Sequence, residues 1–99
     1  MDTQFQVIYS DVVREQVKQL AEQATQQSLG LVFVRALRAI NARLHADPLT
    51  FGEALYTLEA AGLEVRLGGE AILIVRYAVD PARYLVYPSA FCLLSVATS

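Results

Sequence analysis

The sequence is poor in the residues that build metal sites and disulfide frameworks. Its 99 residues include one cysteine, Cys92, and one histidine, His45, and no tryptophan. A lone cysteine excludes an intrachain disulfide, and we expect Cys92 to be a buried, inert thiol. One histidine and one cysteine are too few for a zinc site built from these ligands. No glycine-rich phosphate loop is present either, so we expect no metal and no cofactor.

Long apolar runs are also missing. The longest, residues 71–75, is far too short to cross a bilayer. The first twenty residues carry five charged side chains and no apolar run of the kind that a signal peptide needs. We therefore expect a cytoplasmic protein that has no membrane partner.

The chain lacks an excess of positive charge. Eight Lys and Arg residues stand against ten Asp and Glu residues, which gives a net charge of −2. Proteins that bind nucleic acids usually carry a basic excess that neutralises phosphates, so the balance argues against a general nucleic-acid binder. Lys18 is the only lysine. The seven arginines, which suit bidentate contacts to carboxylate or phosphate, leave a local basic patch possible.

What is present is enough for one folded domain. Hydrophobic residues make up 55% of the chain and charged residues 18%. A chain of this length and composition buries a hydrophobic core without disulfides. We expect residues 1–99 to form a single domain.

The first half of the chain predicts one strand and two helices. Residues 4–9 alternate loosely and predict a strand. Ser10 is a good N-cap for a helix over residues 11–26, and apolar residues recur there at helical spacing. A second amphipathic helix covers residues 31–46 and ends at Asp47-Pro48, because the residue before a proline avoids helical angles. The short connection predicts an antiparallel helix pair.

The second half of the chain predicts strands. Residues 55–58 form a short strand or an extended approach, and residues 63–67 alternate as a half-buried strand. Gly68-Gly69 predicts a hairpin turn, residues 71–79 a central strand, and residues 83–87 a last strand that Pro88 ends. The apolar tail at 91–94 predicts a final helical turn. The fold class is α+β, with a four-stranded, mostly antiparallel sheet and the helical hairpin packed on one face.

Several local motifs occur in a characteristic order. They are Val7-Ile8-Tyr9-Ser10 before the first helix, Ala46-Asp47-Pro48 after the second, the Phe51-Gly52 turn, Leu63-Glu64-Val65-Arg66-Leu67, and Tyr77-Ala78-Val79-Asp80. In order and spacing they resemble the RelE/ParE toxin superfamily of bacterial type II toxin–antitoxin modules. The resemblance covers nearly the whole chain. It implies the fold given above and a cognate antitoxin protein as partner.

The resemblance implies two different activities. RelE-like members are ribosome-dependent mRNA endonucleases that use basic residues on the central strands and a late basic residue or tyrosine. ParE-like members share the fold, lack that constellation and poison DNA gyrase. Of the basic positions only Arg66 matches here; Glu64 and the segments 73–74 and 89–91 are not basic where RNase members are. The candidate catalytic residues are therefore Arg66, Arg76, Arg83 and Tyr87, provided that their side chains share one face.

Each candidate also has a structural interpretation. Arg66 suits a cross-strand ion pair, Arg76 must reach the open sheet face or a partner, and His45 suits the C-terminal end of its helix. We expect the toxin component of a toxin–antitoxin module, or an inactive diverged relative, that acts by binding a partner. The alternatives are an mRNA endonuclease of the RelE type and a small structural or regulatory protein that shares only the topology. Expected partners are an antitoxin, the ribosome with mRNA or DNA gyrase, and a second copy of the chain.

Overall fold

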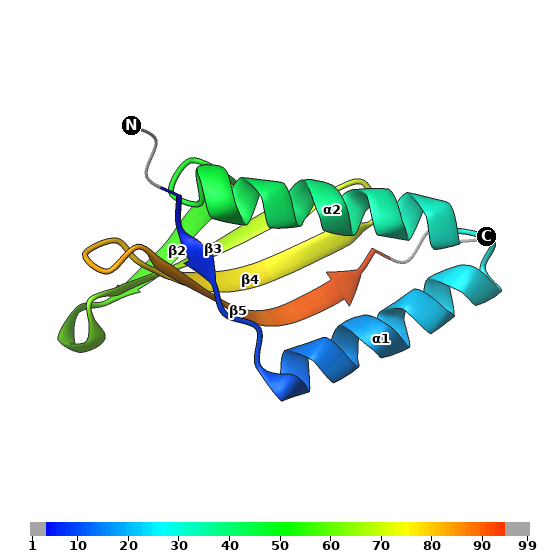
Figure 1. Cartoon of the computed structure of the whole chain (residues 1–99), viewed down its shortest axis with the longest axis horizontal. Helices are drawn as coiled ribbons and strands as arrows, with labels where there is room; N and C mark the ends of the chain where they lie inside the picture. The colour runs from blue at the N-terminus through cyan, green and yellow to red at the C-terminus, as the bar shows by residue number, and fades with distance from the viewer. Residues whose placement is uncertain (1–3, 95–99) are drawn as a thin grey trace.

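The computed structural model describes residues 4–94, which form a mixed five-stranded sheet with two helices on one face (Figure 1). The elements in chain order are β1 (Gln6–Val7), α1 (Asp11–Gln26), α2 (Gly30–Ala46), β2 (Glu53–Leu58), a 3₁₀ turn (Glu59–Ala61), β3 (Leu63–Glu70), β4 (Leu73–Asp80) and β5 (Leu85–Leu93). The predicted α+β class and the order of strand, helix pair and meander are confirmed. The sheet has five strands rather than four, because residues 53–58 pair with β3 along their length, apart from a register shift at Leu55.

The strand order is β1-β5-β4-β3-β2. Strands β2 to β5 form an antiparallel meander, and β1 joins the far side of β5 in parallel. The last strand is therefore an interior strand, and the two edges are the short β1 and the longer β2. The predicted first strand, 4–9, is reduced to two residues. Gln6 and Ile8 donate their backbone N–H groups toward β5, whereas Phe5 donates its own to the His45 carbonyl at 2.8 Å and so ties the strand to the end of α2.

Local signals define both helices. The Ser10 hydroxyl accepts a hydrogen bond from the Val13 backbone N–H at 3.2 Å, and Asp11 places negative charge in the first turn of α1. Helix α2 ends at the predicted Asp47-Pro48 step. His45 lies in the last turn of α2, and its Nδ1 atom is 2.9 Å from the Phe5 carbonyl oxygen, so it joins the helix to the first strand. Within residues 4–94, neither helix is long and apolar enough to span a membrane.

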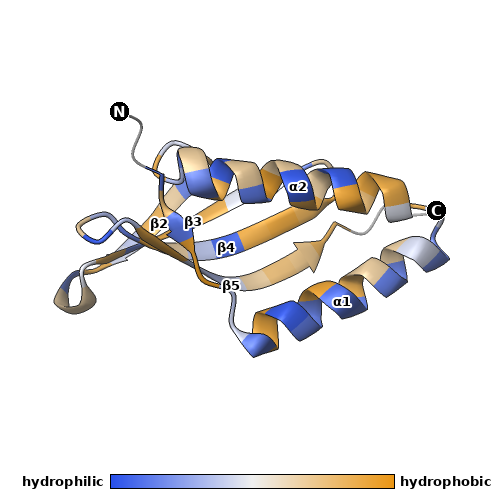
Figure 2. Cartoon of the chain, in the orientation of Figure 1, coloured by the Kyte–Doolittle hydropathy of each residue, from blue (hydrophilic) through white to orange (hydrophobic). Residues whose placement is uncertain are grey.

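The core lies between the helices and one face of the sheet. Its largest fully buried side chains include Tyr77, Phe33, Ile40, Leu44 and Leu73. In Figure 2 the strands are mostly orange, whereas the visible side of α1 is mostly blue, as a helix with one solvated face should be.

Two predicted strand ends are wrong. Strand β3 runs through Gly68-Gly69 to Glu70, and the turn follows at Ala71, which has a φ of 50°. Strand β5 continues past Pro88 to Leu93, so the tail is strand and not helix. Pro88 is tolerated there because it lies next to a register shift opposite Arg76 and Tyr77, where the regular ladder is interrupted.

The glycines of β3 have a packing role that the structure makes testable. A Cβ atom on Gly68 would lie 2.5 Å from Cε2 of the Phe51 ring, whereas the nearest atom to a Cβ on Gly69 would be 3.4 Å away. We expect Gly68→Ala to lower the free energy of unfolding by about 1–3 kcal/mol through overpacking. The matched Gly69→Ala should change it by less than about 0.5 kcal/mol. Urea unfolding of both variants measures this, and equal stabilities would contradict the packing role.

Candidate functional site

The four predicted catalytic residues do not share one face. Residues opposite each other in an antiparallel pair point to the same side, and Arg66 is opposite the fully buried Tyr77. Arg66 therefore faces the helices, while Arg76, the neighbour of Tyr77 along β4, faces the open side. Tyr87 is opposite Ala78 and also faces the open side. Arg83 lies in the β4–β5 turn, where its backbone N–H donates to Asp80 Oδ1 at 3.2 Å.

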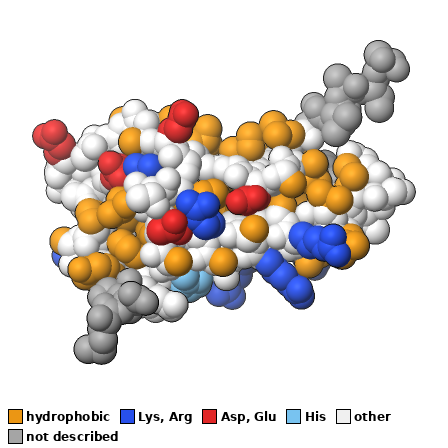
Figure 3. Space-filling model, turned by 90° about the horizontal axis from the view of Figure 1, so that it is seen from above, with side chains coloured by type: hydrophobic (Ala, Val, Ile, Leu, Met, Phe, Trp, Pro, Cys, Tyr) orange, Lys and Arg blue, Asp and Glu red, His pale blue; other side chains and the backbone are white. Residues whose placement is uncertain are grey.

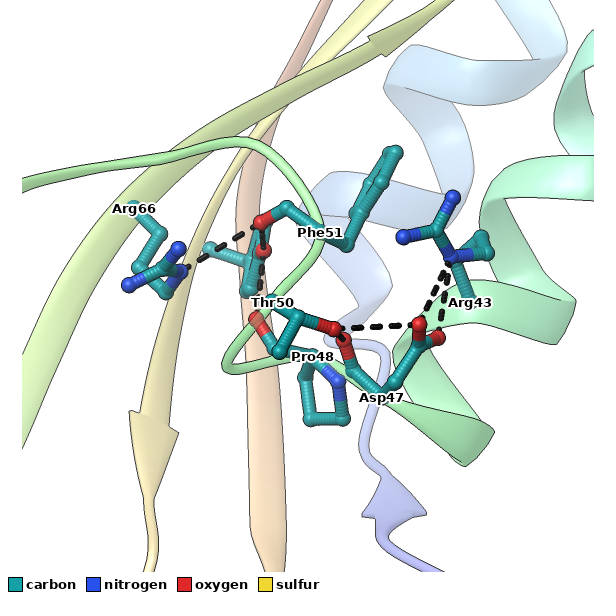
Figure 4. A network of polar contacts seen from close by, with 7 residues as sticks. Arg43, Asp47, Pro48, Thr50, Phe51 and Arg66 are labelled. Atoms are coloured by element: carbon teal, nitrogen blue, oxygen red, sulfur yellow. Dashed lines mark hydrogen bonds and ion pairs between the residues drawn. The ribbon is translucent and has the colours of Figure 1, made fainter.

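Arg66 is engaged in contacts within the protein. It is only 8% exposed. Its Nε donates to the Phe51 carbonyl at 3.3 Å, Nη2 donates to the Gly52 carbonyl at 3.1 Å, and Nη1 donates to Glu64 Oε2 at 3.0 Å. The predicted ion pair of Arg66 is thus made with Glu64 on the same strand rather than across strands. These contacts hold the chain where it enters β2, as Figure 4 shows for Phe51.

Tyr77 holds the same segment from β4. Its hydroxyl is 2.7 Å from the Pro48 carbonyl oxygen and also within hydrogen-bond distance of the Phe51 carbonyl oxygen. A hydroxyl has one proton, so it donates to one of these oxygens at a time. Burial raises the pKa of Tyr77, which keeps the phenol protonated. We call the group of Pro48, Phe51 and Gly52 with Arg66 and Tyr77 the turn clasp.

A second network supports the turn clasp from α2. Arg43 Nε donates to both carboxylate oxygens of Asp47, at 2.9 and 3.1 Å, and the Thr50 hydroxyl donates to Asp47 Oδ2 at 3.1 Å (Figure 4). The guanidinium carbon of Arg43 lies 5.0 Å from the centre of the Phe51 ring, within cation–π range. Arg43 lowers the pKa of Asp47 through this hydrogen bond. The contacts around Arg66, Tyr77 and Arg43 therefore hold the α2–β2 connection in place.

The opposite face of the sheet is largely apolar and carries no helix of the part of the chain that the structure describes. Strand β3 turns Glu64 and Arg66 toward the helices and Leu63, Val65 and Leu67 toward the open side. A shallow cavity of about 210 Å³ lies on this side. We call its surroundings the open face, which consists of Leu55, Leu67, Ile74, Arg76, Ala90 and Cys92. The prediction that Cys92 is buried is wrong, because Cys92 is opposite Ile74 on this face and is exposed.

The open face continues into a free sheet edge. Every residue of β2 is exposed, including Leu55 at 47% and Tyr56 at 51%. Strand β2 pairs only with β3, so its outer backbone N–H and C=O groups have no strand beside them in residues 4–94. Free edges of this kind pair readily with another chain. Sequence analysis missed this surface, although the apolar residues of 54–58 were a usable signal.

The open face carries little chemistry for catalysis. Arg76 is the only charged residue that lines the cavity, and it forms no ion pair within the described range. Tyr87 is a diagonal neighbour of Arg76 on the same face. No group of three or more His, Cys, Asp or Glu side chains in residues 4–94 could hold a metal ion.

Comparison with known proteins found no matching family model, no matching curated protein and no matching solved structure. The resemblance to RelE/ParE toxins therefore rests on the sequence motifs, and the fold rests on the structure.

Removal of the Arg66 side chain should destabilise the protein. Arg66→Ala removes one donor each from the buried Phe51 carbonyl, the part-buried Gly52 carbonyl and Glu64, so we expect the free energy of unfolding to fall by about 2–4 kcal/mol. The control Arg76→Ala removes an exposed arginine that has no ion pair within the described residues, and should stay within about 0.5 kcal/mol of the wild type. Chemical denaturation of both variants decides this. A fully stable Arg66→Ala variant would contradict the clasp.

The ion pair between Arg43 and Asp47 should make stability depend on pH. The pKa of Asp47 is lowered below its ordinary value of 3.8 in the folded state. Its contribution is complete above pH 3.8 and is lost as the pH falls through the lower folded value. Thermal melting at pH 7 should therefore show Asp47→Asn below the wild type, and the difference should shrink as the pH falls below 3.8. Glu59→Gln serves as a control with no difference across this range. A difference for Asp47→Asn that does not shrink below pH 3.8 would refute the assignment.

Proposed function

We propose that the chain is the toxin component of a bacterial type II toxin–antitoxin module and that it acts by binding protein partners rather than by cleaving RNA. The observation that carries this proposal is the reversed polarity of β3. Its apolar side chains lie on the outward side, where Leu67 is 39% exposed and Val65 is buried, and its charged side chains Glu64 and Arg66 face the helices. Exposed apolar surface beside a polar rim is typical of a protein-binding site.

The geometry of the open face suits an extended segment of a partner. A partner strand can pair with the free edge of β2 through backbone hydrogen bonds, which is the mode called β-augmentation. Its alternate side chains then lie over Leu55, Leu67 and Ile74. Arg76 would supply the one charged contact, so we expect an acidic residue in that segment. An antitoxin segment is the expected occupant, and a target such as DNA gyrase would compete for the same face.

The geometry gives less support to RNA cleavage. Cleavage through a ribose 2′-hydroxyl needs a proton acceptor, a proton donor and positive charge that converge on one phosphate. Arg66 and Tyr77 are engaged in the turn clasp, and Arg83 lies beside Asp80. Only Arg76 and Tyr87 remain on one face, and the chain carries a net charge of −2.

The test is induced expression of the chain alone in a bacterial host. We expect growth arrest with the wild type, and loss of arrest with Leu55→Glu, which places a charge on the open face. Leu31→Glu is the matched control, because Leu31 is also an exposed leucine, at 65%, but lies on α2. It should arrest growth like the wild type. Circular dichroism confirms that both variants fold.

Two results would contradict the proposal. The first is unimpaired growth with a soluble, folded wild-type chain. The second is equal arrest by the wild type and Leu55→Glu. Bulk protein synthesis is followed in the same cultures. An early loss of protein synthesis with the wild type that is absent with a folded Arg76→Ala variant would favour the endonuclease instead.

A further inference from the structure

A second surface lies on the helix side of the sheet, away from the open face. A cavity of about 490 Å³ opens between α1, α2 and the segment that joins β1 to α1. We call it the interhelix cavity; it is lined by Tyr9, Arg14, Val17, Leu37, Arg38 and Asn41. Its volume falls within the range of about 300–1,000 Å³ that is usual for small-molecule sites.

The floor of the interhelix cavity is apolar. Val17 on α1 and Leu37 on α2 are half-buried and pack against the hydrophobic core. Such a floor favours a ligand with an apolar body, because binding removes the apolar surface of the ligand and of the two side chains from water.

The rim of the cavity carries uncompensated positive charge. Arg14 and Arg38 come from facing helices, both are exposed, and no acidic residue lines the cavity. Neither forms an ion pair with any carboxylate in residues 4–94, whereas Arg43, Arg66 and Arg83 each lie beside one. In Figure 3, which views the molecule from the α2 side, blue side chains along the lower edge have no red neighbours, unlike those further up. Two of the four arginines that form no ion pair within residues 4–94 therefore line this cavity.

A hydrogen bond fixes the remaining wall. The Tyr9 hydroxyl donates to Asn41 Oδ1 at 2.6 Å and so ties the segment before α1 to α2. Burial raises the pKa of Tyr9, so the phenol stays neutral and adds no negative charge to the cavity. Because Oδ1 accepts this bond, the amide NH₂ group of Asn41 is left as a donor.

From these features we propose that the interhelix cavity binds a small organic carboxylate. The carboxylate lies between Arg14 and Arg38, whose guanidinium groups match its planar, bidentate geometry. The apolar body lies on Val17 and Leu37. A singly charged head suits the site better than a phosphate dianion, because most of the lining is apolar and a second charge costs more to desolvate. This inference does not depend on the proposed function.

The probe is octanoate, titrated into the ¹⁵N-labelled protein and followed by two-dimensional NMR. We expect saturable shifts at Val17, Leu37 and Asn41, with much weaker binding of octanol and of acetate, which lack the charge and the apolar body respectively. Arg14→Gln and Arg38→Gln should each weaken octanoate binding about tenfold, as expected for the loss of a charge-assisted hydrogen bond. Arg35→Gln is the matched control on α2, outside the cavity lining, and should stay within about twofold of the wild type.

Several outcomes would overturn the inference. They are the absence of saturable octanoate binding, octanol binding as tightly as octanoate, and acetate binding as tightly as octanoate. Tighter binding of octyl phosphate would overturn the choice of carboxylate. If Arg14→Gln and Arg38→Gln bind octanoate like the wild type, these arginines do not take part in the binding, which would also contradict the proposal. The NMR spectrum of each variant reports whether it is folded, so a loss of binding is not confused with unfolding.

Discussion

The structure depends on how the α2–β2 connection is held. Three carbonyl groups of this connection point into the protein, and the side chains of Arg66 and Tyr77 supply their donors. A buried carbonyl without a donor would cost roughly 1–3 kcal/mol. The turn clasp therefore fixes where β2 begins, and with it the register of the sheet edge. It also engages Arg66, the arginine that matches a basic position of the toxin family, in three hydrogen bonds within the protein.

The same constraint produces the two unlike surfaces of the molecule. Arg66 and Glu64 take the inward positions of β3, so the apolar residues of that strand face outward. Burial of a charge without partners is costly, and here the partners are an adjacent carboxylate and two backbone oxygens. The open face is thus a consequence of the clasp as much as a surface for binding. The helices, on the other side, leave a cavity with arginines at its rim.

The sequence predicted the features that depend on neighbouring residues. Ser10 and the Asp47-Pro48 step define helix ends through local hydrogen bonds and sterics, and both helices lie where expected. The failures depend on distant partners. Gly68 was predicted to be a turn residue, but it lies in β3, where the Phe51 ring leaves no room for a side chain. Pro88 was predicted to end the last strand, but a register shift beside it allows the strand to continue. The alternation of side chains along a strand correctly predicted that Arg66 and Val65 lie on opposite faces of the sheet. It did not indicate which of these two faces the helices would cover.

The interior position of β5 has a consequence for synthesis of the chain. Strand β5 lies between β1 and β4 and supplies Val86 and Phe91 to the core. The Phe91 backbone N–H also donates a hydrogen bond to Gln16 Oε1 of α1 at 2.6 Å. During translation, residues 4–84 are synthesised before the strand that joins β1 to the rest of the sheet. Such a nascent chain exposes β4 and the core face of α1 together. Any product that terminates before residue 85 therefore lacks the strand between β1 and β4, and we expect it to be a substrate for proteolysis rather than a smaller folded domain.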